Sequence, residues 1–244
     1  MVEGLFSAAA GMAAQQQRLD AISNDVANVS TDGYQSERIG FQDLLYSPAG
    51  YASGATVATG AGAAITQMGT SQAQGPLQQT GRTLDVALVG PGYFEVRPAT
   101  GAVSLTRDGA FTLDARGQLT TADGSVVQPP ITVPAGVADS AVAIGPDGTV
   151  KANGQAIGKL AIVNVPAPAQ LLASGSSTFT PTAASGAARA VTGTTVRQGT
   201  LEGSNVDISQ EMVDMMDAQR SYSLDSQAIK IQQQMMQTAN EVKR

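Results

Sequence analysis

The chain has 244 residues, no cysteine, no histidine and a net charge of −6. These counts exclude disulfides, thiolate metal sites and catalysis by a cysteine nucleophile or a histidine base, and the acidic balance disfavours nucleic-acid binding. Charged residues make up only 14% of the chain and glycine occurs 27 times, which favours short strands, tight turns and close backbone contacts.

No stretch of about 18 apolar residues occurs in the chain, so we expect no transmembrane helix. The first 28 residues do not fit a cleaved secretory signal, because Glu3 makes the start acidic and Gln15, Gln16, Gln17 and Arg18 interrupt the apolar run. If the protein leaves the cytoplasm, we expect a route that retains its N-terminus.

The first predicted element is a helix over residues 3–28. At about 1.5 Å per residue this helix would be roughly 39 Å long. We expect it to end near Asn28, where Ser30–Gly33 has the composition of a turn. Apolar residues recur every seven positions, or two helical turns, and so form a stripe of Leu5, Met12, Leu19 and Val26. A second series with the same spacing is Ala8, Gln15, Ile22 and Val29, in which Gln15 is polar.

Two kinds of segment follow this helix. Phe41, Leu44 and Leu45 fall on one face of a short amphipathic piece. Residues 47–80 are rich in Gly, Ala, Ser, Thr and Gln and contain few groups that could offset the entropy of ordering them. We therefore predict a flexible arm, which partners could order as a hairpin or an extended arm.

In residues 84–165, apolar side chains recur at every second position within short runs, and turn dipeptides separate these runs. Gly90–Gly92 forms one turn, Pro129-Pro130 breaks the series, and Gly158–Val165 is predicted as one further strand. Aspartates beside glycine in this region are interpreted as turn residues and not as metal ligands. Because Asp-Gly and Asn-Gly favour turns that match strand twist, we predict hairpins at Asp108-Gly109, Asp123-Gly124, Asp147-Gly148 and Asn153-Gly154.

Residues 166–197 should return through irregular or strand-like structure to a second long helix over 208–243. Asp207 is the predicted N-cap, Gln210 completes a capping box, and Glu211 lies in the positive first turn. This helix would be about 54 Å long. Its residues with a period of seven are Ile208, Met215, Tyr222, Ile229 and Met236.

Both stripes are interpreted as parts of an assembly surface. Each is too narrow for a stable isolated pair of helices, because polar residues such as Glu211, Asp225 and Gln232 flank the second one. Ordinary core packing explains most stripes on single helices, and these two can also close on each other. We favour completion by neighbouring copies, at a self-assembly interface of Leu5, Met12, Leu19, Ile22, Val26, Asn28, Val29, Ile208, Met212, Met215, Tyr222, Ile229 and Met236.

Several segments resemble the bacterial flagellar rod and hook proteins. Leu5–Met12, Gln16–Asp20 and Ile22–Tyr34 resemble the N-terminal motif of that family, and Phe41–Tyr46 is similar to its next block. Further matches follow in the family's order at Leu84–Leu88, Gly90, Gly92–Phe94, Thr106–Gly109, Gly117–Leu119, Gln198–Asp207, Ala218–Tyr222 and Met236–Asn240. The turn positions of these motifs are Gly33, Tyr34, Gly92, Gly109, Gly203 and Asn205.

The pattern of elements predicts an α+β fold, and the resemblance implies how it is arranged. Long N- and C-terminal helices would pack together as an inner coiled-coil-like layer, with a central antiparallel β-rich domain facing outward and a Gly/Ala/Ser-rich arm. The segments would be 1–46 for the N-terminal assembly helix and turn, 47–80 for the arm, 81–197 for the outer domain and 198–244 for the C-terminal assembly helix. No catalytic activity, cofactor or metal is implied.

The resemblance further implies an axial subunit of the flagellar basal-body rod in the periplasm. Such a subunit is exported through the flagellar type III apparatus without a cleaved signal. It polymerises helically with its own copies into a hollow, torque-transmitting shaft and export channel. Its partners would be proximal rod subunits, hook subunits and surrounding ring proteins.

Two alternatives lie within this family and two outside it. Gln219–Tyr222 and Thr238–Asn240 favour the distal rod type, whereas Pro166–Ala169, in place of an expected Asn-Pro segment, leaves the proximal rod relative open. The hook type is less favoured, because it usually carries a larger outer domain. Outside the family, the alternatives are a monomeric adhesin and a secreted β-rich polysaccharide hydrolase using two aspartates such as Asp108 and Asp114.

Overall fold

The structure is a computed structural model that describes residues 2–43, 46–50, 56–60, 62–99, 101–191 and 193–242. It divides into two compact units. The helical unit consists of Met1–Ala27, Arg38–Met68 and Asp207–Arg244, and the β unit consists of Asn28–Glu37 and Gly69–Val206. The prediction of an α+β fold with mostly antiparallel strands is confirmed.

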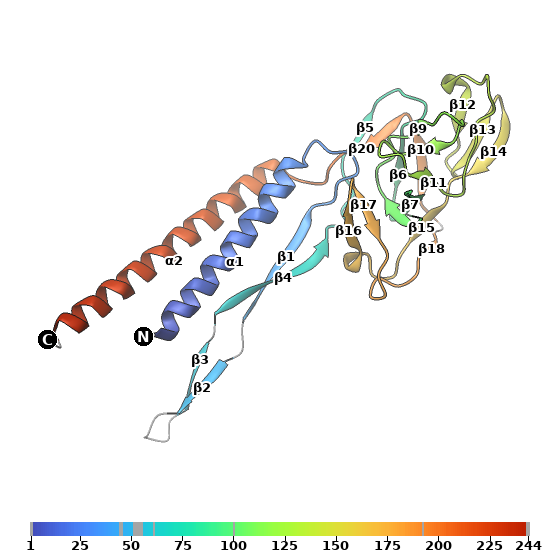
Figure 1. The fold of residues 1–244 in the computed structure, drawn as a ribbon. Helices are drawn as coiled ribbons and strands as arrows, with labels where there is room; N and C mark the ends of the chain where they lie inside the picture. Colours follow the sequence, from blue (N-terminus) through green and yellow to red (C-terminus); the bar gives the residue numbers. More distant parts are fainter. Residues whose placement is uncertain are drawn as a thin grey trace. The chain divides into compact units, whose positions relative to one another are not determined.

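Two long helices dominate the helical unit, α1 (Val2–Ala27) and α2 (Ile208–Val242). They lie side by side and run in opposite directions (Figure 1). Alanine and glutamine are frequent in α1, and both are good helix formers. Its end agrees with the predicted turn: the Thr31 amide donates to the Asn28 carbonyl at 3.0 Å, and Gly33 takes a φ of +66°.

The N-terminus of α2 is capped as predicted, but by one half of a capping box. The Asp207 carboxylate accepts the backbone amides of Ser209 at 2.9 Å and Gln210 at 3.4 Å. The Gln210 side chain donates to Asp214 at 3.0 Å, one turn further on, instead of reaching back to the cap. Lys243 and Arg244, expected at the negative end of the helix, lie outside the described residues.

The segment after α1 is extended at Phe41, the described member of the predicted short amphipathic piece. Phe41 lies in β1 (Glu37–Asp43), which pairs with β4 (Ala63–Thr70); Leu44 and Leu45 lie outside the described residues. Gly40 allows close packing in this ribbon, because a Cβ there would lie 2.6 Å from the Met68 sulfur. Beyond it, β2 (Tyr46–Gly50) and β3 (Thr56–Gly60) pair antiparallel.

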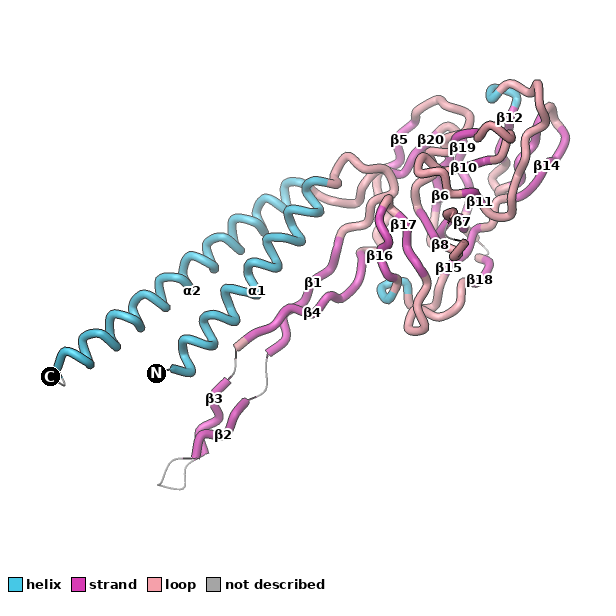
Figure 2. Tube along the Cα trace, viewed as in Figure 1, coloured by secondary structure: helices cyan, strands magenta, loops and turns pink. Residues whose placement is uncertain are grey.

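The described strands of the β unit form several sheets (Figure 2). The largest has the order β16-β17-β8-β7-β11-β10-β9, with β15 joining β7 to β18, while β12, β13 and β14 form a second sheet. β6 pairs with β19, and β5 pairs with β20. The strands are β5 Leu77–Gln79, β6 Val86–Val89, β7 Tyr93–Arg97, β8 Ser104–Thr106, β9 Thr112–Leu113, β10 Leu119–Thr120, β11 Val126–Val127, β12 Val142–Ile144, β13 Thr149–Ala152, β14 Gln155–Lys159, β15 Ile162–Asn164, β16 Leu172–Gly175, β17 Thr178–Thr180, β18 Arg189–Ala190, β19 Thr195–Gln198 and β20 Thr200–Glu202. Two short 3-10 helices span Asp139–Ala141 and Pro168–Gln170.

Three of the four predicted hairpins are present. Asp123-Gly124, Asp147-Gly148 and Asn153-Gly154 join the antiparallel pairs β10–β11, β12–β13 and β13–β14. Asp108-Gly109 does not make a hairpin, because β8 pairs with β7 and β17 while β9 pairs with β10. The single strand predicted over Gly158–Val165 is also wrong, since β14 ends at Lys159 and β15 begins at Ile162.

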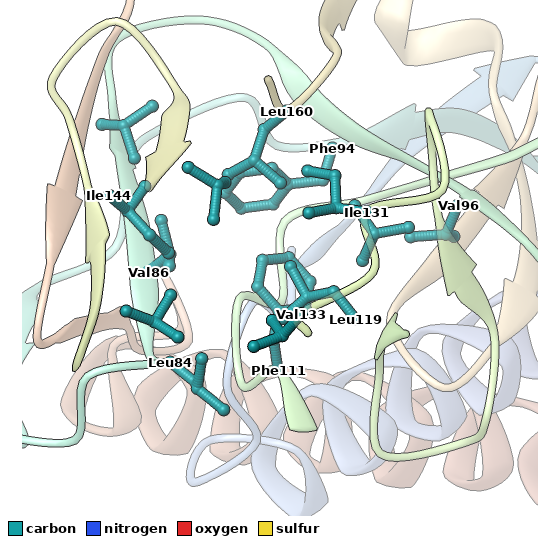
Figure 3. Close-up of a cluster of buried hydrophobic side chains, with 14 of the residues drawn as sticks. Leu84, Val86, Phe94, Val96, Phe111, Leu119, Ile131, Val133, Ile144 and Leu160 are labelled. Atoms are coloured by element: carbon teal, nitrogen blue, oxygen red, sulfur yellow. The ribbon is translucent and has the colours of Figure 1, made fainter. Parts of the chain in front are cut away.

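The β unit is built around an apolar core (Figure 3). Phe94 of β7 and Phe111 meet edge to face at its centre, with ring centroids 5.1 Å apart. A second cluster lies around Tyr93 and Phe179, whose ring centroids are 5.8 Å apart. Members of the main core come from many strands and loops and include Leu84, Val86, Val96, Leu119, Ile131, Val133, Ile144 and Leu160.

Candidate assembly surface

Few side chains are fully buried on α1 and α2 among those that are described, and one ion pair joins the two helices. Ala14 and Ile22 of α1 and Ala218 of α2 are buried. Arg18 forms an ion pair with Asp214, with 2.8 Å between its guanidinium and the carboxylate. This interface buries few large apolar groups among the residues whose side chains are described.

Acidic groups gather near the start of α2. Burial raises the pKa of the Glu211 carboxyl above its ordinary value, the negative charges of Asp25 and Asp214 raise it further, and the positive charge of Arg18 opposes them. Asp25 is itself buried on α1. The ionised form of Glu211 is therefore disfavoured where the two helices meet.

The β1–β4 ribbon lies along α1 within the helical unit (Figure 1). Gly62, just before β4, packs so closely on this helix that a Cβ there would lie 2.9 Å from the Ala10 Cβ and 3.3 Å from the Ser7 Cα. The Arg18 guanidinium lies 5.9 Å from the centre of the Phe41 ring, within cation–π range. One arginine therefore contacts both α2 and the ribbon.

The predicted stripe on α1 is partly covered. Met12, Leu19 and Val26 are half-buried and Ile22 is buried, whereas the side chain of Leu5 lies outside the described part of the structure. Asn28 and Val29 belong to the turn after the helix. There the Asn28 side chain accepts a hydrogen bond from the Thr31 hydroxyl at 3.2 Å. Their role in self-assembly stays a prediction.

The predicted stripe on α2 changes its environment along the helix. A strict period of seven falls short of two helical turns, so such a series drifts by about 20° per heptad around a straight helix. This drift places the members at different angles around α2, and their exposure differs. Ile208 and Tyr222 are exposed, and Met215, Ile229 and Met236 are half-buried. Met212, which the predicted interface also includes, is exposed.

A second apolar stripe lies on α2, and its spacing differs from a strict period of seven. Its members share one face of a helix with 3.6 residues per turn, and each is between 47% and 60% exposed. The signal that could have revealed it is spacing by three, four, seven and eight residues. The members of this stripe, called the outer stripe below, are Val213, Met216, Leu224, Ile231 and Met235.

The motif turns in the β unit allow backbones to approach closely. Gly33 donates its amide to the Glu202 carbonyl at 2.8 Å, and a Cβ on it would lie 2.4 Å from the Asp108 amide nitrogen. Gly109 also allows a close approach of two backbone segments, because a Cβ on it would lie 1.7 Å from the Val86 carbonyl oxygen. Its φ is not positive. Gly92, with a φ of +138°, packs against Ile162.

The remaining motif residues surround the segment that leads to α2. Gly203 donates its amide to the Pro76 carbonyl at 2.9 Å, and the Asn205 amide donates to the Tyr34 carbonyl at 3.4 Å. The Asn205 side chain makes three further hydrogen bonds to backbone groups. Sequence reasoning named these residues but did not indicate that they bond to one another's segments.

Models of known protein families match the regions of this chain that contain the helices and the motif residues described above. The family descriptions that match are a flagella basal body rod protein domain over residues 5–35, the flagellar hook protein FlgE/F/G D1 domain over 87–152 and the flagellar basal body rod FlgEFG protein C-terminal domain over 197–242. The chain is 36% identical to the flagellar basal-body rod protein FlgG of Borreliella burgdorferi, with 100% of both chains aligned. The chain belongs to the flagellar basal-body rod protein family.

Two further relatives carry the same description. The FlgG rod protein of Agrobacterium fabrum is 36% identical over 93% of this chain and 94% of the relative, and that of Bacillus subtilis is 34% identical over 100% of both. The rod family is structural, so this chain is a structural protein and not an enzyme. Its N- and C-terminal matches contain most of α1, all of α2 and the motif residues Gly33, Gly203 and Asn205.

In the part of this rod-family chain that the structure describes, neither helix is long and apolar enough to cross a membrane. Those residues also contain no group of three or more acidic side chains placed to hold a metal ion.

Proposed function

We propose that this chain is a structural subunit of the distal flagellar rod that polymerises helically with its own copies into a hollow, torque-transmitting shaft. The observation that carries the proposal is the outer stripe of α2, an apolar surface on a helix whose opposite side is already covered by α1. Exposed apolar patches on soluble chains mark interaction surfaces. The full-length similarity to FlgG rod proteins supports the distal type over the proximal rod, the hook and a hydrolase.

Helical polymers need a heterologous contact, in which two different faces of one subunit meet. The helix α2 offers two such faces, because Ile208 and Tyr222 lie apart from the outer stripe around the helix, with Met212 between the two faces. Each large apolar side chain buried between subunits would contribute about 1.5–3 kcal/mol. Repeated along a polymer, these contacts would form the inner coiled-coil-like layer.

The remaining parts of the proposal rest on family membership. The subunit would be exported through the flagellar type III apparatus without a cleaved signal and would assemble in the periplasm. Its neighbours would be proximal rod and hook subunits, and the surrounding ring proteins could contact the β unit. Within the predicted arm 47–80, residues 69–80 belong to the β unit, so flexibility in the free chain and ordering between subunits are proposed for residues 47–68. The helices of the predicted segments 1–46 and 198–244 would form the inner layer, and the predicted segment 81–197 would form the outer domain.

The test replaces two members of the outer stripe with glutamate. In purified Leu224→Glu/Ile231→Glu protein we expect the helical content and melting temperature of the parent, because both side chains are exposed. In cells that depend on this chain, we expect no rods in isolated basal bodies and no motility, because a charge would be buried in each contact.

The matched control is Leu224→Met/Ile231→Leu, which keeps the outer stripe apolar and should assemble. Normal basal bodies in cells carrying the glutamate variant would contradict the proposal.

A further inference from the structure

The chain passes between the sequence segments of the two units at 27/28, 37/38, 68/69 and 206/207. Three short segments of the β unit adjoin these crossings, namely residues 28–37, 69–76 and 199–206. Any force between α1 or α2 and the β unit that travels along the backbone has to pass through them. The way in which these three segments are joined to one another therefore decides how such a force is shared.

One side chain, that of Asn205, bonds to both of the other segments. Its carbonyl oxygen accepts the Ser36 amide at 2.8 Å, and its NH₂ group donates to the carbonyls of Ser71 at 3.2 Å and Ala73 at 2.9 Å. The two N–H donors of an asparagine side chain are thus both used. The Ser71 amide also donates to the Ser36 carbonyl at 2.8 Å.

Glu202, three residues earlier, anchors the same segments to the β core. Its backbone carbonyl accepts the Gly33 amide at 2.8 Å, and its carboxylate accepts the Gly75 amide at 3.1 Å. The other carboxylate oxygen pairs with Arg107 at 2.9 Å, and Arg107 also donates to the Gly90 carbonyl at 3.0 Å. The three segments are thereby tied to the loops that flank β7 and β8.

The backbones at this point leave no room for added side chains. A Cβ on Gly75 would lie 2.0 Å from the Gly203 carbonyl oxygen. Such close packing keeps the hydrogen-bonded groups in contact and makes their geometry depend on Asn205. Aspartate could not replace it, because a carboxylate would face the two carbonyl oxygens that the NH₂ group now contacts.

We propose that Asn205 is a positioning residue that gathers the three segments into one unit, so that load applied to any of them is shared by all and passed to the β core through Glu202. The mechanical part of this inference rests on the proposed rod function. The hydrogen bonds that Asn205 and Glu202 make to the three segments, called the clamp below, form within one chain and can be tested without assembly.

The first experiment is hydrogen exchange on the purified chain with Asn205→Asp. We expect about tenfold faster exchange at the Ser36 and Ser71 amides, because the two hydrogen bonds that the Asn205 NH₂ group donates are lost and the segments separate more often, and unchanged exchange in the core strand β7. Asn153→Asp, the same change in the β13–β14 turn, should leave all these amides unchanged. Unaltered exchange at Ser36 and Ser71, or equal acceleration in β7, would overturn the clamp.

The second experiment measures swimming of Asn205→Asp cells in media of increasing viscosity. We expect rods in parental number, parental speed at low load, and at least a twofold greater loss of speed than the parent at high load. Parental speed at every load, or failure of the variant to assemble, would overturn load sharing. If the parent chain itself forms no rods, the proposed function fails, and the exchange experiment still decides on the clamp.

Discussion

Arg107 and Glu202 form a buried ion pair in a chain with few charges. Each is only 3% exposed, and their charged groups are 2.9 Å apart. The Arg107 guanidinium also lies 5.6 Å from the centre of the Tyr93 ring, and the Tyr93 hydroxyl donates to Gln72 at 2.7 Å. Because both charges are removed from water, removing one would leave the other buried without compensation.

We expect Glu202→Gln to lower the free energy of unfolding of the β unit by about 3–5 kcal/mol, since it leaves the Arg107 charge unpaired. Urea unfolding of the purified protein measures this loss. Asp217→Asn is the control, because Asp217 is 58% exposed and its 3.7 Å contact with Arg220 is a surface pair. The control should cost less than about 0.5 kcal/mol, and similar losses in both variants would contradict the assigned role of burial.

For single residues, the sequence predicted special positions but not the reason why each is special. The turn dipeptides marked glycines correctly as special positions, but Gly109 is needed for a close approach to the Val86 carbonyl and not for a hairpin. Asn205 was recognised as a motif residue without a role. In both cases the reason lies in segments distant along the chain, and a local pattern carries no information about them.

At the scale of elements, charged side chains lie at the contact between the two helices, and one apolar stripe of α2 is exposed. Arg18, Asp25, Glu211 and Asp214 lie on or near the contact between α1 and α2, while the outer stripe is exposed. The ends of both helices could be predicted, because capping and turn residues act locally. Which face is covered could not, because this depends on the partner helix.

The raised pKa of Glu211 gives a prediction about pH. Because its folded pKa lies above the unfolded value of about 4.3, its ionisation is unfavourable in the folded state. Its full contribution to stability is present below the unfolded pKa and is lost as pH rises through the folded pKa. We therefore expect Glu211→Gln to raise the melting temperature of the helices at pH 7 relative to the parent, and to have little effect near pH 4.

Thermal melting followed by far-UV circular dichroism at the two pH values measures this difference. Glu241→Gln, at an exposed position on the same helix, should change neither melt. An identical shift of the Glu211 variant at both pH values would show that the effect does not come from ionisation.

For strands, as for helices, local features could be predicted from the sequence and long-range contacts could not. The hairpins at Asp123-Gly124 and Asn153-Gly154 follow from local turn chemistry and were predicted. The pairing of β6 with β19 joins residues more than a hundred positions apart and has no local signal. Period two also failed to predict burial in β6, where Val86, Ala87 and Leu88 are all buried because both faces of the strand are covered.

For the whole molecule, the two units differ in what stabilises them. The β unit has two clusters of buried apolar side chains, including Phe94 and Phe111. In the helical unit, the buried apolar side chains among those described are Ala14, Ile22 and Ala218. Because burial of apolar surface is the main favourable term in folding, the β unit should be the more stable of the two.

We expect calorimetry of the free chain to show two transitions, with the helical unit melting first. Ile22→Val should lower only the first transition and Ile131→Val only the second, because each removes one buried methylene from one unit, at a cost of about 0.5–1.5 kcal/mol. In the larger β unit this corresponds to a shift of about 2–4 °C per kcal/mol. A single transition that moves equally with both substitutions would contradict independent melting.

The sequence by itself determined the two terminal helices, most of the hairpins, the lack of cysteine and histidine chemistry, and the resemblance to flagellar rod proteins. These features depend on local spacing, capping, turn residues and composition, which the sequence gives without knowledge of distant contacts. The tertiary structure alone decided that an ion pair of Arg18 with Asp214 joins α1 to α2, that the outer stripe of α2 stays exposed, and that Asn205 joins three segments. Each of these depends on which surfaces meet in space, because periodicity places a side chain on a face but does not say what that face will contact.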